Sequence, residues 1–141
     1  MIVSWQWYAL GSAFFAGLTA VLAKAGVQGM PSNTATLIRT VVIGIFLTIV
    51  VSVRQEWLDP AVLTKKSIVF LVLSGLATGL SWMLYFRALQ LGNVSMVSSV
   101  DKLSLPFAVI LSIVFLSEHV GVQQWAGIAL VTAGTFLIAV K

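Results

Sequence analysis

Five long apolar stretches alternate with short polar ones along the 141-residue chain. A helix needs roughly 20 mostly apolar residues to cross the hydrocarbon core of a bilayer. The polar stretches contain glycine, proline, asparagine or charged residues, which favour turns, and most are short enough to make neighbouring helices antiparallel. The pattern therefore predicts five membrane-spanning helices, at about 5–24, 34–53, 67–88, 95–117 and 122–140.

The composition indicates that lipid is the solvent of this chain. Hydrophobic residues make up 60% of it and charged residues 9%, against about 25% charged in soluble domains; mean hydropathy is +1.07. The apolar segments are too long and too even for the strands of a membrane barrel. The first lacks a basic start and is longer than the core of a cleaved signal peptide. We predict an all-α, polytopic membrane protein with five transmembrane helices in one bundle, forming a single domain over residues 1–141.

The sequence offers little for metal, redox or catalytic chemistry. It has no cysteine and one histidine, His119, which excludes disulfides and a usual zinc site. No catalytic or nucleotide-binding motif is present, so we expect neither an enzyme nor a bound cofactor or metal. The net charge of +4 could suggest nucleic acid, but the basic residues form no stripe, and no nucleic-acid partner is expected.

Small residues recur within the apolar segments at helical spacing. Gly75 and Gly79 form a GxxxG pair in the third, and Gly127 and Gly134 lie seven apart in the fifth. Small residues let helix backbones approach closely in lipid, where van der Waals contact drives association. Most of these positions fit ordinary helix packing. The fifth segment has no ionisable residue before Lys141, so Gly127 and Gly134 are the candidates for a dimer seam.

An acid and a lysine lie inside the fourth apolar segment. Asp101 and Lys102 stand six to seven residues beyond position 95, roughly 10 Å from the start of the helix. Antiparallel threading brings them toward the same membrane face as Arg39 and Arg87. A charge at the centre of a span costs roughly 2.5–3.5 kcal/mol, so such residues usually face a bundle interior or a watery cavity. We expect these four residues to contribute to a polar cluster within the membrane.

Two interpretations of this cluster remain open. In the first, Asp101 and Lys102 form an ion pair that fixes helix register. In the second, at least one of Asp101, Lys102 and Arg39 contacts a solute or ion. Adjacent helical residues point about 100° apart, so one of the pair is expected to face a neighbouring helix and the other a cavity. Lys24, Arg39, Arg87 and Lys102 would together outweigh Asp101 in charge, which favours an anionic or zwitterionic solute.

Three further residues belong to the candidate pathway. Pro106 cannot donate to the carbonyl of Lys102, so it predicts a kink with a freed carbonyl; kinked helices at mid-depth recur in transporter binding sites, although a tolerated packing kink is equally compatible. Trp82 and Tyr85 lie three residues apart on one helix face. Trp82 is too deep for an interfacial anchor, which leaves a cavity wall or ordinary core packing.

The shallow basic residues are balanced between the two membrane sides. Arg54, Lys65 and Lys66 lie on the N-terminal side, and Lys24, Arg87 and Lys141 on the other, so the difference is 3 − 3 = 0. Orientation follows such differences. Either orientation, or a mixture of both, is compatible with this count.

The whole chain also resembles a known family. In residues 85–140 a Pro-containing fourth helix ends in an acid, Glu118, and precedes a Q-x-x-G-x-x-x-x-x-x-G fifth helix with Gln124, Gly127 and Gly134. This pattern resembles the EamA domain of the drug/metabolite transporter superfamily. "FFAGLTAVLAKAGVQG", "ATLIRT" and "DKLS" are similar to its small five-helix, half-size branch.

The resemblance implies a secondary transporter for a small metabolite or drug-like solute, located in the inner membrane of a prokaryote. Larger members resemble two such units fused in opposite orientations around a cavity, so a half-size chain is expected to act as a homodimer. The balanced charge favours an antiparallel, dual-topology homodimer surrounded by membrane lipid. Two other possibilities remain: an accessory subunit paired with another protein, such as a lipid-carrier flippase, and a signalling or structural scaffold.

Overall fold

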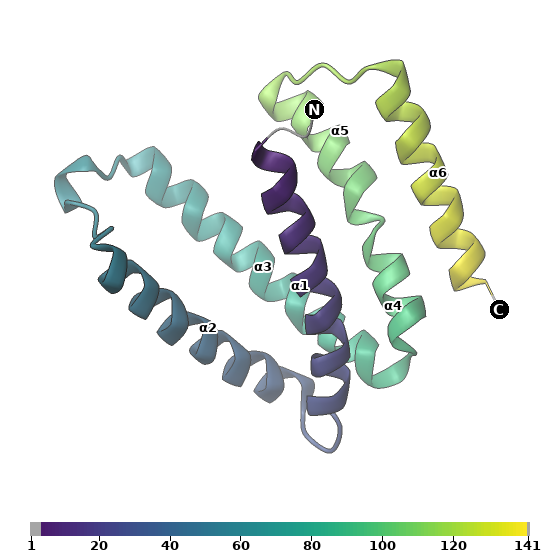
Figure 1. The fold of residues 1–141 in the computed structure, drawn as a ribbon, viewed down its shortest axis with the longest axis horizontal. Helices are drawn as coiled ribbons and strands as arrows, with labels where there is room; N and C mark the ends of the chain where they lie inside the picture. Colours follow the sequence, from purple (N-terminus) through teal and green to yellow (C-terminus); the bar gives the residue numbers. More distant parts are fainter. Residues whose placement is uncertain (1–3, 141) are drawn as a thin grey trace. The chain divides into compact units, whose positions relative to one another are not determined.

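The computed structural model of the protein describes residues 4–140. Within this range the chain forms α-helices, one short 3₁₀-helix and no strand (Figure 1). The elements in chain order are α1 (Ser4–Gly26), α2 (Ser32–Arg54), η1 (Pro60–Val62), α3 (Lys65–Leu91), α4 (Val94–Asp101), α5 (Ser104–Leu116) and α6 (Val122–Ala139).

Within residues 4–140, five helical segments are long and apolar enough to cross a membrane. They are Trp5–Gly26, Ser32–Arg54, Lys65–Leu91, Val94–Leu116 and Val122–Ala139. Each overlaps one of the five spans predicted from the apolar pattern, with ends that differ by up to three residues. The prediction of an all-α, polytopic membrane protein is therefore confirmed.

The fourth span differs from the uninterrupted helix expected at 95–117. It is divided into α4 and α5 by a turn at Lys102 and Leu103. There the backbone changes to tighter i→i−3 hydrogen bonds, with the N–H groups of Lys102 and Leu103 donating to the carbonyls of Ser99 and Val100. The break lies one turn before Pro106, which cannot supply the next i→i−4 donor.

Two compact units are present in the chain. One consists of Ala25–Gln90, and the other combines the residues up to Lys24 with those from Leu91 onward. In the first unit α2 and α3 form a helical hairpin through the loop that contains η1 (Figure 1). In the second, α6 packs against α4 and, to a lesser extent, against α5.

The core of the Ala25–Gln90 unit lies where α2 begins and α3 ends. Phe86 and Leu89 of α3 are buried there, together with Val27 in the preceding loop and Ala35 and Thr36 in the first turns of α2. The four-residue spacing of Thr36, Thr40, Gly44, Thr48 and Ser52 continues along α2. The four hydroxyls of that stripe each donate to the carbonyl four residues earlier, at 2.8–2.9 Å. This pairing satisfies polar groups that water cannot reach in a bilayer.

Polar residues define several helix ends. Gln55 and Ser117 adopt the left-handed conformation (φ 54° and 55°) just after α2 and α5, which turns the chain out of the helix. At the start of α6 the side-chain Oε1 of Gln124 accepts the N–H of Gly121 at 2.7 Å. This contact gives the glutamine of the Q-x-x-G pattern a structural role, since it satisfies a donor that lies at the helix N-terminus.

Candidate functional site

Arg39 of α2 lies against the aromatic side chains of α3. Its guanidinium carbon is 4.3 Å from the centroid of the Trp82 ring and 5.5 Å from that of Phe86. Both distances fall within the range of attractive cation–π contacts. Trp82 and Phe86 are four residues apart, so they lie about one helical turn apart on the same face of α3. The hairpin thus holds a partly buried cation against two rings within a predicted span.

Tyr85 joins this group from the same helical turn. It is half-buried and close enough to Arg39 to interact with it electrostatically. The sequence named Arg39, Trp82 and Tyr85 as separate candidates for the pathway, and the structure brings these three side chains together within one unit. Whether they line a solute pathway is a separate, functional prediction.

Arg87 takes part in a different network, at the end of α3. Its Nη1 donates to Oε1 of Gln90 at 3.0 Å. The Nε2 of Gln90 donates to the carbonyls of Val27 at 3.1 Å and Met30 at 2.7 Å. Gln90 thereby connects the end of α3 to the loop before α2. The exposed side chain of Arg87 donates to the amide oxygen of Gln90 and helps to position it. This arrangement gives Arg87 a local bracing contact in addition to its predicted place in the pathway.

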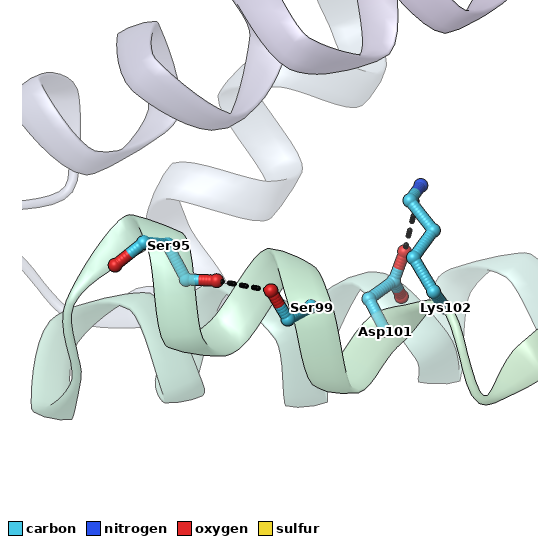
Figure 2. Close-up of polar contacts among 4 residues, drawn as sticks. All are labelled: Ser95, Ser99, Asp101 and Lys102. Atoms are coloured by element: carbon cyan, nitrogen blue, oxygen red, sulfur yellow. Dashed lines mark hydrogen bonds and ion pairs between the residues drawn. The ribbon is translucent and has the colours of Figure 1, made fainter. Parts of the chain in front are cut away.

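Asp101 and Lys102 form an ion pair at the junction of α4 and α5. The Nζ of Lys102 lies 4.0 Å from Oδ2 of Asp101, and the two side chains are 60% and 44% exposed (Figure 2). Lys102 keeps right-handed helical dihedrals (φ −67°, ψ −12°) where α4 ends, so the long lysine side chain itself reaches the neighbouring carboxylate. That one of the pair faces a neighbouring helix and the other a cavity stays a prediction. Figure 2 also shows the Ser99 hydroxyl bonded to the Ser95 carbonyl, at 2.7 Å.

The carbonyl of Lys102 is not left open by Pro106. It accepts the N–H of Leu105 at 3.0 Å, so the break resolves as a tight turn rather than as a freed acceptor. Pro106 itself is half-buried in the first turn of α5, where a missing N–H is best tolerated. The predicted hinge at Pro106 therefore lies one turn after the discontinuity in the fourth span.

Lys24, at the end of α1, is also engaged by the backbone. Its Nζ donates to the carbonyl of Gly92 at 2.9 Å, in the short connection between α3 and α4. The sequence counted this lysine among the charges that favour an anionic solute and among the shallow basic residues, and it did not predict this contact. In the structure it caps a carbonyl that follows a helix, where cations are favourable.

Two residues of these networks were missed by sequence reasoning. Phe86 was overlooked although its spacing of four from Trp82 marks the same helical face. Gln90 was overlooked because nothing local identifies the loop carbonyls that it reaches 60 and 63 residues away. The available signal was a polar residue at the end of a span, opposite a glycine-containing loop whose backbone carbonyls can accept hydrogen bonds.

Gly127 and Gly134 lie on α6 beside the residues that face α4. Ile128 and Thr135, one position further on, are buried, whereas a Cβ added at either glycine would meet nothing within 4 Å. The same is true of Gly17, Gly44, Gly75 and Gly79. Each of these small-residue faces is therefore open within its own unit.

Metal binding has no support in the described part of the chain. Residues 4–140 hold no group of three histidine, cysteine, aspartate or glutamate side chains that could bind a metal ion. The shallow hollow formed by Trp5, Gln6, Ala9 and Leu10 lies along α1 alone and contains none of the residues predicted to line a pathway.

The fold and the charged groups within its spans define a polytopic α-helical membrane protein, in which intramembrane ionisable residues typically mark solute or ion pathways. The chain belongs to the EamA-like transporter family, which it matches over residues 3–140. It is 47% identical to an uncharacterized transporter in the cobO 3′ region of Sinorhizobium sp. over 140 residues, 99% of each chain. No solved structure matches it. The family resemblance and the transporter class are thus confirmed.

Proposed function

We propose that the protein is one subunit of a secondary transporter for a small metabolite or drug-like solute. In this proposal two copies insert in opposite orientations and form an antiparallel homodimer that works by alternating access. Membership of a transporter family supports transport. A bacterial relative of nearly equal length supports a half-size chain in the inner membrane of a prokaryote.

The observation that carries the antiparallel arrangement is the charge balance across the membrane. Three shallow Lys or Arg residues lie on each side of the five spans, so the usual bias that fixes orientation is absent. Two oppositely inserted copies would place a copy of each polar group near both membrane faces. Such pseudosymmetry about the membrane plane underlies alternating access in transporters built from inverted repeats.

The residues take the following roles in this proposal. Arg39, Trp82, Tyr85, Arg87, Asp101 and Lys102 line the solute pathway. Pro106 and the neighbouring break allow the fourth span to bend. Gly127 and Gly134 pack the seam between the two copies, which accords with the open space beside both glycines in the single chain.

Reporter fusions at the C-terminus test the proposal. One reporter is active only in the cytoplasm and the other only outside the inner membrane; dual insertion predicts substantial signal from both. As a control, Gln28→Lys adds a positive charge to the loop between α1 and α2, and should raise the cytoplasmic signal at the expense of the other. Signal from a single reporter would remove the basis for an antiparallel homodimer. A stable monomer that co-purifies with another membrane protein would instead support an accessory subunit.

A further inference from the structure

We propose that Arg39 is an anchor for the carboxylate of a small organic anion, held ready by the rings of Trp82 and Phe86. This inference rests on the proposed transport function and adds the chemical class of the solute. The site consists of Arg39, Trp82, Tyr85 and Phe86, which we call the arginine–aromatic site.

Among the described residues, Arg39 contacts two aromatic rings and no hydrogen bond to an oxygen is seen for it. A cation over a ring is attracted by the π-electrons and forms no N–H···O bond with them. Guanidinium has five N–H groups, and their fork matches the two oxygens of a carboxylate. The contacts at 4.3 and 5.5 Å therefore fix the position of the cation while leaving oxyanion recognition to another partner.

No acidic side chain of the Ala25–Gln90 unit can neutralise Arg39. The acids of this unit are Glu56 and Asp59, both beyond Arg54, the last residue of α2. Arg54 is 15 residues past Arg39, which corresponds to about 22 Å along a helix. Glu56 is moreover engaged by Arg54, with Nη1 and Oε1 3.5 Å apart. The unit thus presents a cation to which it supplies no anion.

Depth favours a solute over a lipid headgroup as the source of that anion. Arg39 is seven residues beyond Ser32, where α2 begins, and this spacing places it about 10 Å inside the span. Headgroup phosphates lie outside the hydrocarbon core. A small carboxylate that enters a polar pathway can reach this depth. The aromatic rings beside it suit an apolar body attached to the carboxylate.

Fixing the arginine in advance lowers the entropy lost when a ligand binds. A free arginine side chain loses rotamer freedom on forming a bidentate pair. Because the rings of Trp82 and Phe86 already restrain Arg39, part of this loss of rotamer entropy occurs when the hairpin folds rather than when the ligand binds. Trp82, in direct contact with the cation, also provides an optical probe of the site.

Ligand binding by a protein with a single tryptophan tests the inference. Trp5, Trp7, Trp57 and Trp125 are replaced by phenylalanine, and the fluorescence of Trp82 is followed in phosphatidylcholine nanodiscs. The probes are acetate, succinate, benzoate and alanine, with benzylamine as a cationic control. We expect a saturable change with at least one carboxylate and none with benzylamine. A carboxylate panel that gives no saturable change would overturn the inference.

Substitutions then identify the group that binds. Arg39→Gln should abolish saturation, and Arg39→Lys, which keeps the charge but not the fork, should weaken affinity about tenfold, as for the loss of one charge-assisted hydrogen bond. Arg54→Gln, at the far end of the same helix, is the matched control and should bind normally. Unchanged affinity in Arg39→Lys or Arg39→Gln would contradict the inference, and so would a signal that requires anionic phosphatidylglycerol. Binding in nanodiscs does not depend on dual insertion, so the topology reporters can fail while this test succeeds.

Discussion

The ammonium of Lys102 lies 4.0 Å from the carboxylate of Asp101, across the point where the fourth membrane span stops being helical. An i,i+1 pair on a continuous helix would diverge by about 100°. Lys102 and Leu103 keep right-handed helical dihedrals in the tight turn before Pro106, so the approach is made by the long, flexible lysine side chain. The break in the helix, the proline and the ion pair thus form one local feature within an otherwise apolar segment.

Neutralising Asp101 should destabilise the protein more than neutralising the pair. Asp101→Asn leaves the charge of Lys102 without its partner inside the span, where an isolated charge costs roughly 2.5–3.5 kcal/mol on insertion scales. Asp101→Asn/Lys102→Gln removes both charges. A double-mutant cycle of unfolding in detergent should give a coupling of about 0.5–1 kcal/mol, near the low end for contacting residues because both side chains are partly exposed. A coupling of zero would mean that the pair contributes nothing to stability.

The same variants separate structure from transport. Both should assemble as the wild-type protein does, but transport requires Asp101 if the pair gates the pathway. Full transport by a normally assembled Asp101→Asn protein would contradict the gating role.

Replacing Pro106 should close the break in the fourth span. Pro106→Ala supplies an N–H that can donate to the carbonyl of Lys102, four residues earlier. Pro106 lies in the first turn of α5, where a missing N–H is best tolerated, so closure should stabilise the protein by well under the roughly 3 kcal/mol that a proline costs in a helix interior. The main effect should be slower amide exchange at Lys102 and Leu103. Hydrogen exchange read by mass spectrometry provides the measurement. Pro60→Ala in η1 is the control; unchanged exchange in the Pro106→Ala span would show that the break does not depend on the proline.

A bulky side chain at Gly134 should disrupt association without disturbing the fold of one chain. The space beside this residue is open in the single chain, so Gly134→Val meets no intrachain neighbour. If α6 forms the seam, the dissociation constant of the dimer in detergent should rise at least about tenfold, equivalent to roughly 1.4 kcal/mol, and the dimer fraction should fall accordingly. Light scattering coupled to size-exclusion chromatography measures this fraction. Gly11→Val on α1, which is equally open, is the control, and an unchanged dimer in Gly134→Val would exclude the α6 seam.

The Ala25–Gln90 unit should be sensitive to truncation where α3 ends. Leu89 is fully buried and Leu84 is 73% exposed on the same helix. Leu89→Ala should lower stability by about 2 kcal/mol, the low end for such changes, because packing rather than transfer from water supplies most of the stabilisation in lipid. Leu84→Ala should have little effect. Unfolding measured in the same detergent compares the two, and equal losses would contradict the position of the core.

The number and limits of the spans followed from the sequence because hydrocarbon thickness imposes a simple length rule. The proximity of Arg39 and Trp82 could also have been expected from the sequence, because antiparallel neighbouring helices bring residues of similar membrane depth close together. The break at Lys102 and Leu103 was anticipated only as a kink at Pro106. Its tight-turn hydrogen bonds depend on local backbone geometry that an apolar pattern does not encode.

The contacts of Gln90 and Lys24 with distant loop carbonyls lay beyond prediction for a different reason. Any polar side chain at a span end can point toward water, a headgroup or a neighbouring loop, and the sequence does not distinguish these partners. Only the folded connections place the carbonyls of Met30 and Gly92 within reach.

Cysteine cross-linking in native membranes tests the antiparallel homodimer most directly, because the chain has no cysteine of its own. Gln28 and Trp57 are both exposed and lie in loops on opposite membrane sides. Gln28→Cys in one copy and Trp57→Cys in a differently tagged copy are co-expressed and treated with a short bis-maleimide. An antiparallel dimer predicts a 28–57 cross-link between the two differently tagged copies. This mixed product should be much more abundant than any 28–28 or 57–57 product. Abundant 28–28 and 57–57 links without the mixed product would contradict it.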